Sequence, residues 1–131
     1  MAGVADVLIV DDESDGCDVL SRFLARDGHT VRSVPNGREA LAALITQTPD
    51  VVVLDLRMPE MDGVSFLEVI RCYLRWSSIP VIVLTALPAG PTVNRARDLG
   101  VRYVFHKAAF RLSDLAEAVN DSLGQPHAGA H

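Results

Sequence analysis

Five polar residues stand where short apolar runs of this chain end, and their types suit one kind of chemistry. They are Asp11, Asp12, Asp55, Thr85 and Lys107. Lys107 is the only lysine, although eleven arginines supply the other side chains of this charge. Three carboxylates, a hydroxyl and an ammonium in one crevice would form the skeleton of an active site that binds a cation.

The apolar runs explain why these residues should meet. Continuous Val, Ile and Leu runs, unlike alternating ones, are typical of strands that are buried on both faces of a parallel sheet. Ligands of such sheets bind beyond the carboxyl ends of the strands. A polar residue at one strand end is common, but the same placement at four ends is not. The runs are Val7–Val10, Val51–Leu54, Val81–Leu84 and Tyr103–Phe105.

The three aspartates predict a metal site. Carboxylates that share a site repel one another and raise each other's pKa unless a divalent cation neutralises them. Oxygen ligands of this kind suit Mg²⁺, which keeps several of its waters and bridges carboxylate and phosphate oxygens. We therefore expect Asp11, Asp12 and Asp55 to form a Mg²⁺ site.

Length and composition narrow the class of protein. The 131 residues, of which 49% are hydrophobic and 22% charged, fit one soluble globular domain with its own core. We place this domain at residues 1–124 and expect the tail at residues 125–131 to be disordered. A net charge of -5 leaves no basic surface for nucleic acid, so direct DNA binding is disfavoured.

The N-terminal segment and the two cysteines bear on where the protein works. The N-terminus lacks the basic region of a signal peptide, and the first apolar run is too short to span a membrane. We therefore expect a cytoplasmic protein without membrane contacts. Cys17 and Cys72 do not suggest a disulfide framework or a zinc site, and both are expected to pack on helices as small apolar residues.

Segments with helical periodicity lie between the strands. Ser14 is expected to cap the first helix, and Gly28 is expected to end it. The buried stripe of the third helix is expected to consist of Phe66, Leu67, Ile70 and Leu74. The helices are predicted from Ser14 to Asp27, from Asn36 to Ile45, from Asp62 or Gly63 onward, and over 92–99 and 112–123.

This alternation of strands and helices predicts an α/β fold. One further strand, His29–Val34, alternates polar and apolar residues as an edge strand does. Right-handed crossovers place helices on both faces of the sheet. The expected fold is a doubly wound, five-stranded parallel sheet with five helices. The flavodoxin-like order 2-1-3-4-5 would keep the second strand at the edge.

One stretch carries a resemblance to a known family. The segment Val52–Gly63, VVLDLRMPEMDG, is similar to the phosphoacceptor strand and following loop of receiver domains of two-component response regulators. The Asp11–Asp12 pair, Thr85 and Lys107 stand in the family's order and at its separations, and the match covers residues 6–123. The chain thus resembles a receiver domain, in particular the stand-alone regulators of chemotaxis and phosphorelays.

The resemblance implies a chemical role for the carboxylates. Asp55 would accept a phosphoryl group from a histidine kinase or a histidine phosphotransfer protein. The chain would have no enzymatic activity beyond this self-catalysed transfer and its own dephosphorylation. Asp12, Asp55 and the backbone carbonyl of Arg57 would bind Mg²⁺ directly, and Asp11 would act largely through water.

The resemblance also implies how the signal is passed on. Lys107 would contact the phosphoryl oxygens as a compact point charge, which a planar guanidinium cannot replace. Thr85 would swing toward the same oxygens and exchange one hydrogen bond for a charge-assisted one. The recipient would be a downstream protein target, or a second receiver in a phosphorylation-dependent dimer.

Several positions depart from the family pattern. Lys107 is usually followed by a proline with a cis peptide bond, whereas Ala108 follows here. The bond is either cis, at a cost of about 2.5 to 4 kcal/mol, or trans with a displaced lysine. Val104 stands at the position of the family's switch aromatic, and segment 87–91 predicts a short, mobile fourth helix. Leu87 is expected to overhang the site and to exclude water from it.

Other interpretations stay open. A pseudo-receiver would use the same fold for protein contacts without phosphorylation, although the complete set of five site residues argues against it. A receiver excised from a longer regulator with an output domain would have an identical sequence. A phosphohydrolase that acts on small molecules would need a general acid where Arg57 stands, and an arginine cannot lose a proton to serve as one.

Overall fold

The computed structural model describes residues 4–124, so the tail predicted at residues 125–131 lies outside the described part. Five strands alternate with five helices along the chain, as predicted. None of the helices in the described part combines the length and the apolar character that a membrane span needs. The elements are β1 (Asp6–Val10), α1 (Ser14–Arg26), β2 (Thr30–Val34), α2 (Gly37–Thr46), β3 (Val51–Leu54), α3 (Gly63–Arg71), β4 (Val81–Thr85), α4 (Pro91–Asp98), β5 (Tyr103–His106) and α5 (Leu112–Gly124).

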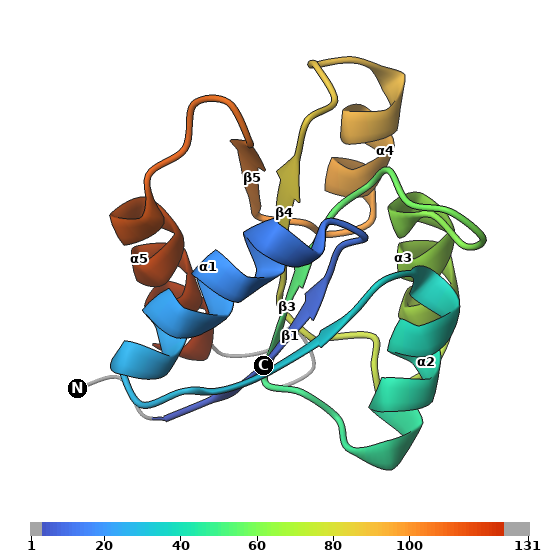
Figure 1. Cartoon of the computed structure of the whole chain (residues 1–131). Helices are drawn as coiled ribbons and strands as arrows, with labels where there is room; N and C mark the ends of the chain where they lie inside the picture. Colours follow the sequence, from blue (N-terminus) through green and yellow to red (C-terminus); the bar gives the residue numbers. More distant parts are fainter. Residues whose placement is uncertain (1–3, 125–131) are drawn as a thin grey trace.

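The strands form one parallel sheet in the order β2-β1-β3-β4-β5. Helices α1 and α5 cover one face of this sheet, and α2, α3 and α4 cover the other (Figure 1). The predicted doubly wound, flavodoxin-like fold is therefore confirmed. The edge strand β2 is only partly buried, in contrast to the fully buried β1, β3 and β4.

Side chains of each central strand alternate between two apolar cores. In β1, Val7 and Ile9 pack with α1 and α5, whereas Leu8 and Val10 pack with α2, α3 and α4. Both sets are buried, which is why the strand reads as a continuous apolar run rather than as an alternating one. The two cores hold the sheet rigidly and therefore hold the residues at its carboxyl edge.

Side-chain caps start two of the helices as predicted. The Asn36 side chain accepts the Glu39 N–H at 2.9 Å, and the Asp62 side chain accepts the Ser65 N–H at 2.8 Å. The predicted cap by Ser14 is wrong, because Glu13 occupies the N-cap position of α1 and makes no side-chain cap there. The Glu13 side chain instead belongs to the site described below.

The end of α3 also differs from the prediction. The helix ends at Arg71, so Leu74 lies beyond it and is 94% exposed instead of completing the buried stripe. Trp76 turns back to fill this part of the core and is 7% exposed. Cys72 is exposed too, which contradicts its expected burial, whereas Cys17 is buried as predicted.

Arg71 ties together the amino edge of the sheet. Its guanidinium donates to the carbonyl oxygens of Leu99 at 2.8 Å, Ser77 at 3.2 Å and Ile79 at 2.8 Å. These carbonyls belong to the connections that enter β4 and β5. Burial lowers the pKa of Arg71 from its ordinary value. One partly buried cation thus joins three segments on the side of the sheet opposite the site.

We expect the two cysteines to differ sharply in reactivity. Burial, reinforced by the nearby Asp11 carboxylate, raises the pKa of Cys17 to about 11, so its thiolate is scarce near neutral pH. Cys72 is exposed. Iodoacetamide at pH 8 should therefore add one label to the native protein, at Cys72, and two labels to the denatured protein. Two labels at comparable rates in the native protein, counted by intact mass, would contradict the burial of Cys17.

Candidate functional site

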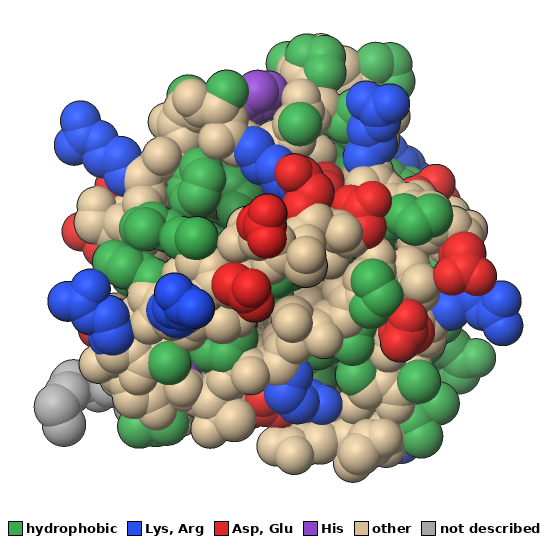
Figure 2. All heavy atoms as spheres, viewed as in Figure 1, with side chains coloured by type: hydrophobic (Ala, Val, Ile, Leu, Met, Phe, Trp, Pro, Cys, Tyr) green, Lys and Arg blue, Asp and Glu red, His purple; other side chains and the backbone are tan. Residues whose placement is uncertain are grey.

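The five residues singled out by the sequence meet at the carboxyl edge of the sheet. Asp11 follows β1, Asp55 follows β3, Thr85 ends β4 and Lys107 follows β5. Asp11, Asp55 and Thr85 are 7%, 4% and 1% exposed, respectively, whereas Asp12 is exposed to solvent. Figure 2 shows acidic side chains gathered around the N-terminal end of α1, at this edge of the molecule.

Backbone hydrogen bonds continue the parallel ladders into the site and so place these residues. The Asp55 N–H donates to the carbonyl of Val10 at 2.9 Å, and the Lys107 N–H donates to the carbonyl of Thr85 at 2.9 Å. The Asp11 N–H donates to the carbonyl of Val34 at 3.0 Å. These three residues are therefore each held by the strand beside them.

The three aspartates form a set of hard oxygen donors. One carboxylate oxygen from each of Asp11, Asp12 and Asp55 lies within 4.8 Å of the others. Several carboxylates at this spacing, with one of them open to solvent, suit Mg²⁺, which binds through a few carboxylates and keeps water ligands. The donor set therefore fits the cation that the sequence predicts. Arg57 donates its backbone N–H to Asp55 Oδ1 at 3.2 Å, so its main chain borders the same carboxylate.

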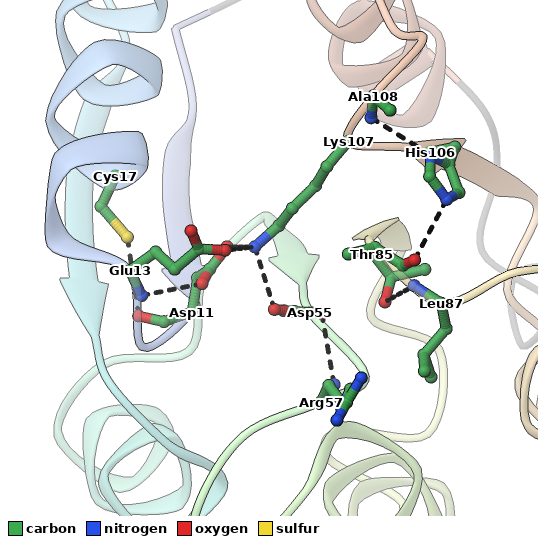
Figure 3. Close-up of polar contacts among 11 residues, drawn as sticks. Asp11, Glu13, Cys17, Asp55, Arg57, Thr85, Leu87, His106, Lys107 and Ala108 are labelled. Atoms are coloured by element: carbon green, nitrogen blue, oxygen red, sulfur yellow. Dashed lines mark hydrogen bonds and ion pairs between the residues drawn. The ribbon is translucent and has the colours of Figure 1, made fainter.

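Lys107 lies among the carboxylates and offsets part of their negative charge. Its ammonium nitrogen is 2.9 Å from Asp11 Oδ2, 3.0 Å from Asp55 Oδ2 and 2.5 Å from Glu13 Oε1 (Figure 3). Burial alone would lower the pKa of Lys107, but the hydrogen bonds to Glu13, Asp11 and Asp55 outweigh it and raise the pKa well above its usual range. The lysine is therefore cationic at every physiological pH.

Two of the three acidic partners of Lys107, Asp11 and Glu13, differ in how their pKa is shifted. Burial raises the pKa of Asp11, and the hydrogen bonds from Lys107 and from the Glu13 N–H offset the effect only in part. The hydrogen bond from Lys107 lowers the pKa of Glu13, which lies at the solvent edge. The pocket thus contains more negative charge than one ammonium can balance.

Thr85 and Leu87 form the wall of the site on the β4 side. The Thr85 hydroxyl oxygen accepts the Leu87 N–H at 3.2 Å. The Leu87 side chain packs against the core formed with α2, α3 and α4, and Figure 3 shows it pointing away from Lys107. The Leu87 side chain is therefore partly drawn into the core, and its expected overhang above Asp55 stays a prediction.

The departures on β5 have structural counterparts. The Lys107–Ala108 peptide bond is trans, and Lys107 nonetheless reaches both Asp11 and Asp55. Val104 packs into the core on the side of α2, α3 and α4, whereas the rings of Tyr103 and Phe105 stack 6.3 Å apart on the opposite face. Helix α4 is short and begins at Pro91, as the proline-rich segment predicts.

Sequence reasoning missed two residues of the site. The first is Glu13, which directly follows the aspartate pair and adds a carboxylate to the same loop. The second is His106, whose ring contacts the backbone of Ala86 and of Ala108. Its position beside Lys107 was visible in the sequence, but its ring direction was not.

Comparisons with known proteins agree with this geometry. The family model described as "Response regulator receiver domain" matches residues 7–120. The DNA-binding transcriptional regulator NtrC of Salmonella typhimurium is 48% identical over 80 residues, which cover 61% of this chain and 17% of that protein. The chain therefore matches only a small part of the length of this relative.

Solved structures share the fold over most of the chain. The receiver domain of a signal transduction histidine kinase from Syntrophus aciditrophicus is 31% identical with a TM-score of 0.84, covering 92% of this chain and 91% of that one. The chemotaxis response regulator CheY4 of Vibrio cholerae is 27% identical with a TM-score of 0.83, covering 92% and 100%. The chain belongs to the response regulator receiver domain family.

Proposed function

We propose that this receiver domain is a phosphorylation switch in which Asp55 accepts a phosphoryl group from a phosphohistidine of a histidine kinase or phosphotransfer protein. The observation that carries this proposal is the position of Asp55. Its carboxylate is buried, adjoins two further aspartates and lies 3.0 Å from the only lysine of the chain. A surface aspartate with no catalytic task would need none of these neighbours.

The chemistry is an in-line displacement at phosphorus. A carboxylate oxygen of Asp55 forms the new O–P bond while the N–P bond of the donor imidazole breaks, and the leaving nitrogen keeps the electron pair and takes up a proton. Lys107 stabilises the negative charge on the phosphoryl oxygens, because its ammonium already lies beside Asp55. The phosphoryl group ends on Asp55 itself, so the chain is modified by the donor and does not convert a separate substrate.

Mg²⁺ would be held by Asp11, Asp12 and Asp55 with the Arg57 carbonyl, and it would supply positive charge for the transferring phosphoryl group. Lys107 occupies the space between Asp11 and Asp55. Glu13 offers this lysine an alternative partner at the solvent edge. We infer that Glu13 helps to retain the lysine nearby when its contacts to the aspartates change.

The switch itself would start at Thr85. Its hydroxyl oxygen accepts the Leu87 N–H, which leaves its O–H free to donate to a phosphoryl oxygen on Asp55. A turn of this side chain would pull on the backbone that follows β4. The signal would then reach a downstream protein or a second receiver through the surface of α4, β5 and α5.

The test is phosphorylation with a small acyl phosphate donor and Mg²⁺, read by intact mass. We expect the gain of one phosphoryl group, lost in excess chelator. Borohydride reduction converts an aspartyl phosphate to homoserine, and peptide mass spectrometry should then place it at position 55. Asp98→Asn, which alters an exposed carboxylate on α4, is the matched control and should label like the parent. No mass gain would favour a pseudo-receiver, whereas labelling that persists in chelator would contradict the Mg²⁺ requirement.

A further inference from the structure

His106 bridges the two loops that carry Thr85 and Lys107. It is the last residue of β5, and it pairs with Thr85 across the sheet. Its Nε2 lies 3.1 Å from the carbonyl oxygen of Ala86, and its Nδ1 accepts the Ala108 N–H at 3.1 Å. Figure 3 shows the ring between the turn at Ala108 and the loop that follows Thr85.

These two contacts determine which ring nitrogen carries the proton. A backbone N–H can only donate, so Nδ1 must offer a lone pair to Ala108. The proton of the neutral ring then resides on Nε2, which donates it to the carbonyl of Ala86. The imidazole therefore forms a continuous chain of hydrogen bonds from one loop to the other.

The contact to Ala108 also shapes the turn that presents Lys107. The Ala109 N–H donates to the carbonyl of His106 at 3.0 Å, which closes a turn with Lys107 and Ala108 at its centre. The Ala108 N–H points to the imidazole, and a proline at this position would have no N–H to donate. Two features thus hold Lys107 in place. Its own N–H donates to the Thr85 carbonyl, and it lies in a turn whose Ala108 N–H is bonded to the His106 ring.

Other side chains of β5 do not connect these loops. Val104 is packed in the core, and the rings of Tyr103 and Phe105 lie on the face covered by α1 and α5. Within the described residues, His106 is the side chain for which hydrogen bonds to both loops are seen.

We propose that His106 is a positioning residue that couples the loop after Thr85 to the Lys107 turn, so that the two groups that contact the phosphoryl group move together. This role rests on the proposed function of Asp55. A shift of Thr85 toward the phosphoryl group would move the Ala86 carbonyl, and the imidazole would transmit this movement to Ala108 and Lys107. In return, the ring would hold Lys107 in place before phosphorylation.

Three variants separate the contacts. His106→Ala removes both hydrogen bonds. His106→Asn keeps an acceptor for the N–H two residues later, as asparagine does in Asx-turns, but cannot reach Ala86. Ala109→Ser is the matched control, because it changes an exposed side chain of the same turn and keeps its backbone hydrogen bond.

The first readout is made without phosphorylation. Nitrogen-15 spectra of the ring should show the proton on Nε2 in the parent. Amide exchange at Ala108 should be faster in His106→Ala, and it should return toward the parent rate in His106→Asn. A ring protonated on Nδ1, or an Ala108 exchange rate that does not change in His106→Ala, would overturn the bridge.

The second readout is the rate of labelling by the acyl phosphate at saturating Mg²⁺. We expect it to fall about threefold to tenfold in both His106 variants, the size of effect of a displaced contact in the transition state, and to stay unchanged in Ala109→Ser. Slow labelling in His106→Asn despite a protected Ala108 amide would show that the link to Ala86 matters by itself. A parent that labels and a His106→Ala variant that labels equally fast would overturn this role alone. A parent that does not label would overturn the proposed function together with it.

Discussion

Replacing Lys107 with alanine is expected to lower the rate of Asp55 phosphorylation about a hundredfold, the usual cost of losing one preorganised charge partner of a transition state. Asp55→Asn gives the background rate of labelling, because it lacks the proposed nucleophile. Lys107→Arg keeps the charge but replaces a compact ammonium with a larger planar fork, and we expect it to be impaired too. Equal labelling rates in the parent and both lysine variants would mean that Lys107 is only a solvated surface cation.

The same substitution should also reveal what the lysine does before phosphorylation. Without it, Asp11, Asp55 and Glu13 lose their shared cation. We expect the metal-free Lys107→Ala variant to lose about 2 kcal/mol of unfolding free energy. Mg²⁺ at a hundred times its Kd would add about 2.7 kcal/mol to either protein. Urea titrations with and without Mg²⁺ measure both quantities, and an undiminished metal-free stability would contradict the counter-ion role.

Gly63→Ala is expected to be the most damaging change of a single methyl group. A Cβ at this position would lie 2.5 Å from the carbonyl oxygen of Asp55 and 2.7 Å from the Cα of Leu56. Both are backbone atoms, so the first turn of α3 or the loop after β3 has to move. Overpacking of this kind costs about 1 to 3 kcal/mol, and here the displaced segment carries Asp55, the proposed phosphoacceptor.

The chain offers a matched control for this prediction. Gly16 is exposed in α1, and a Cβ there would meet no atom within 4 Å. Gly16→Ala should therefore stabilise the protein by about 0.5 to 1 kcal/mol, as alanine does in a helix interior. For Gly63→Ala, we expect a lower unfolding temperature and a lower labelling rate than for the Gly16→Ala control. If both alanine variants are equally stable and equally labelled, α3 does not lie tightly against the Asp55 backbone.

What the sequence could predict here depended on the range of the interactions. The ends of the buried strands were readable because each run of Val, Ile and Leu stops at a polar residue, and parallel pairing then brings Asp55 and Lys107 together whatever the loops do. Caps such as Asn36 and Asp62 were readable because they satisfy neighbouring N–H groups within one turn.

The positions that were mispredicted, or could not be predicted, depend on where a helix begins or ends and on how loops fold. Leu74 continues the helical spacing of α3, but the helix ends before it, and Trp76 supplies the apolar surface instead. Ser14 is a good capping residue by type, yet the helix begins with it rather than after it, because Glu13 is in the cap position. The ring direction of His106 depends on two loops that are far apart in sequence from each other, and no local spacing encodes it.

Because of Arg71, substitutions at the two edges of the sheet should affect different properties: the amount of folded protein at one edge and its reactivity at the other. Its guanidinium serves three carbonyl oxygens from separate connections, so its loss would leave three acceptors without their donor at once. Such damage lowers the fraction of chains that stay folded in the cell, where unfolded chains are degraded, and it leaves the reactivity of each surviving molecule intact. We expect a change at Asp55 to abolish the labelling of every folded molecule, whereas a change at Arg71 should lower the number of folded molecules.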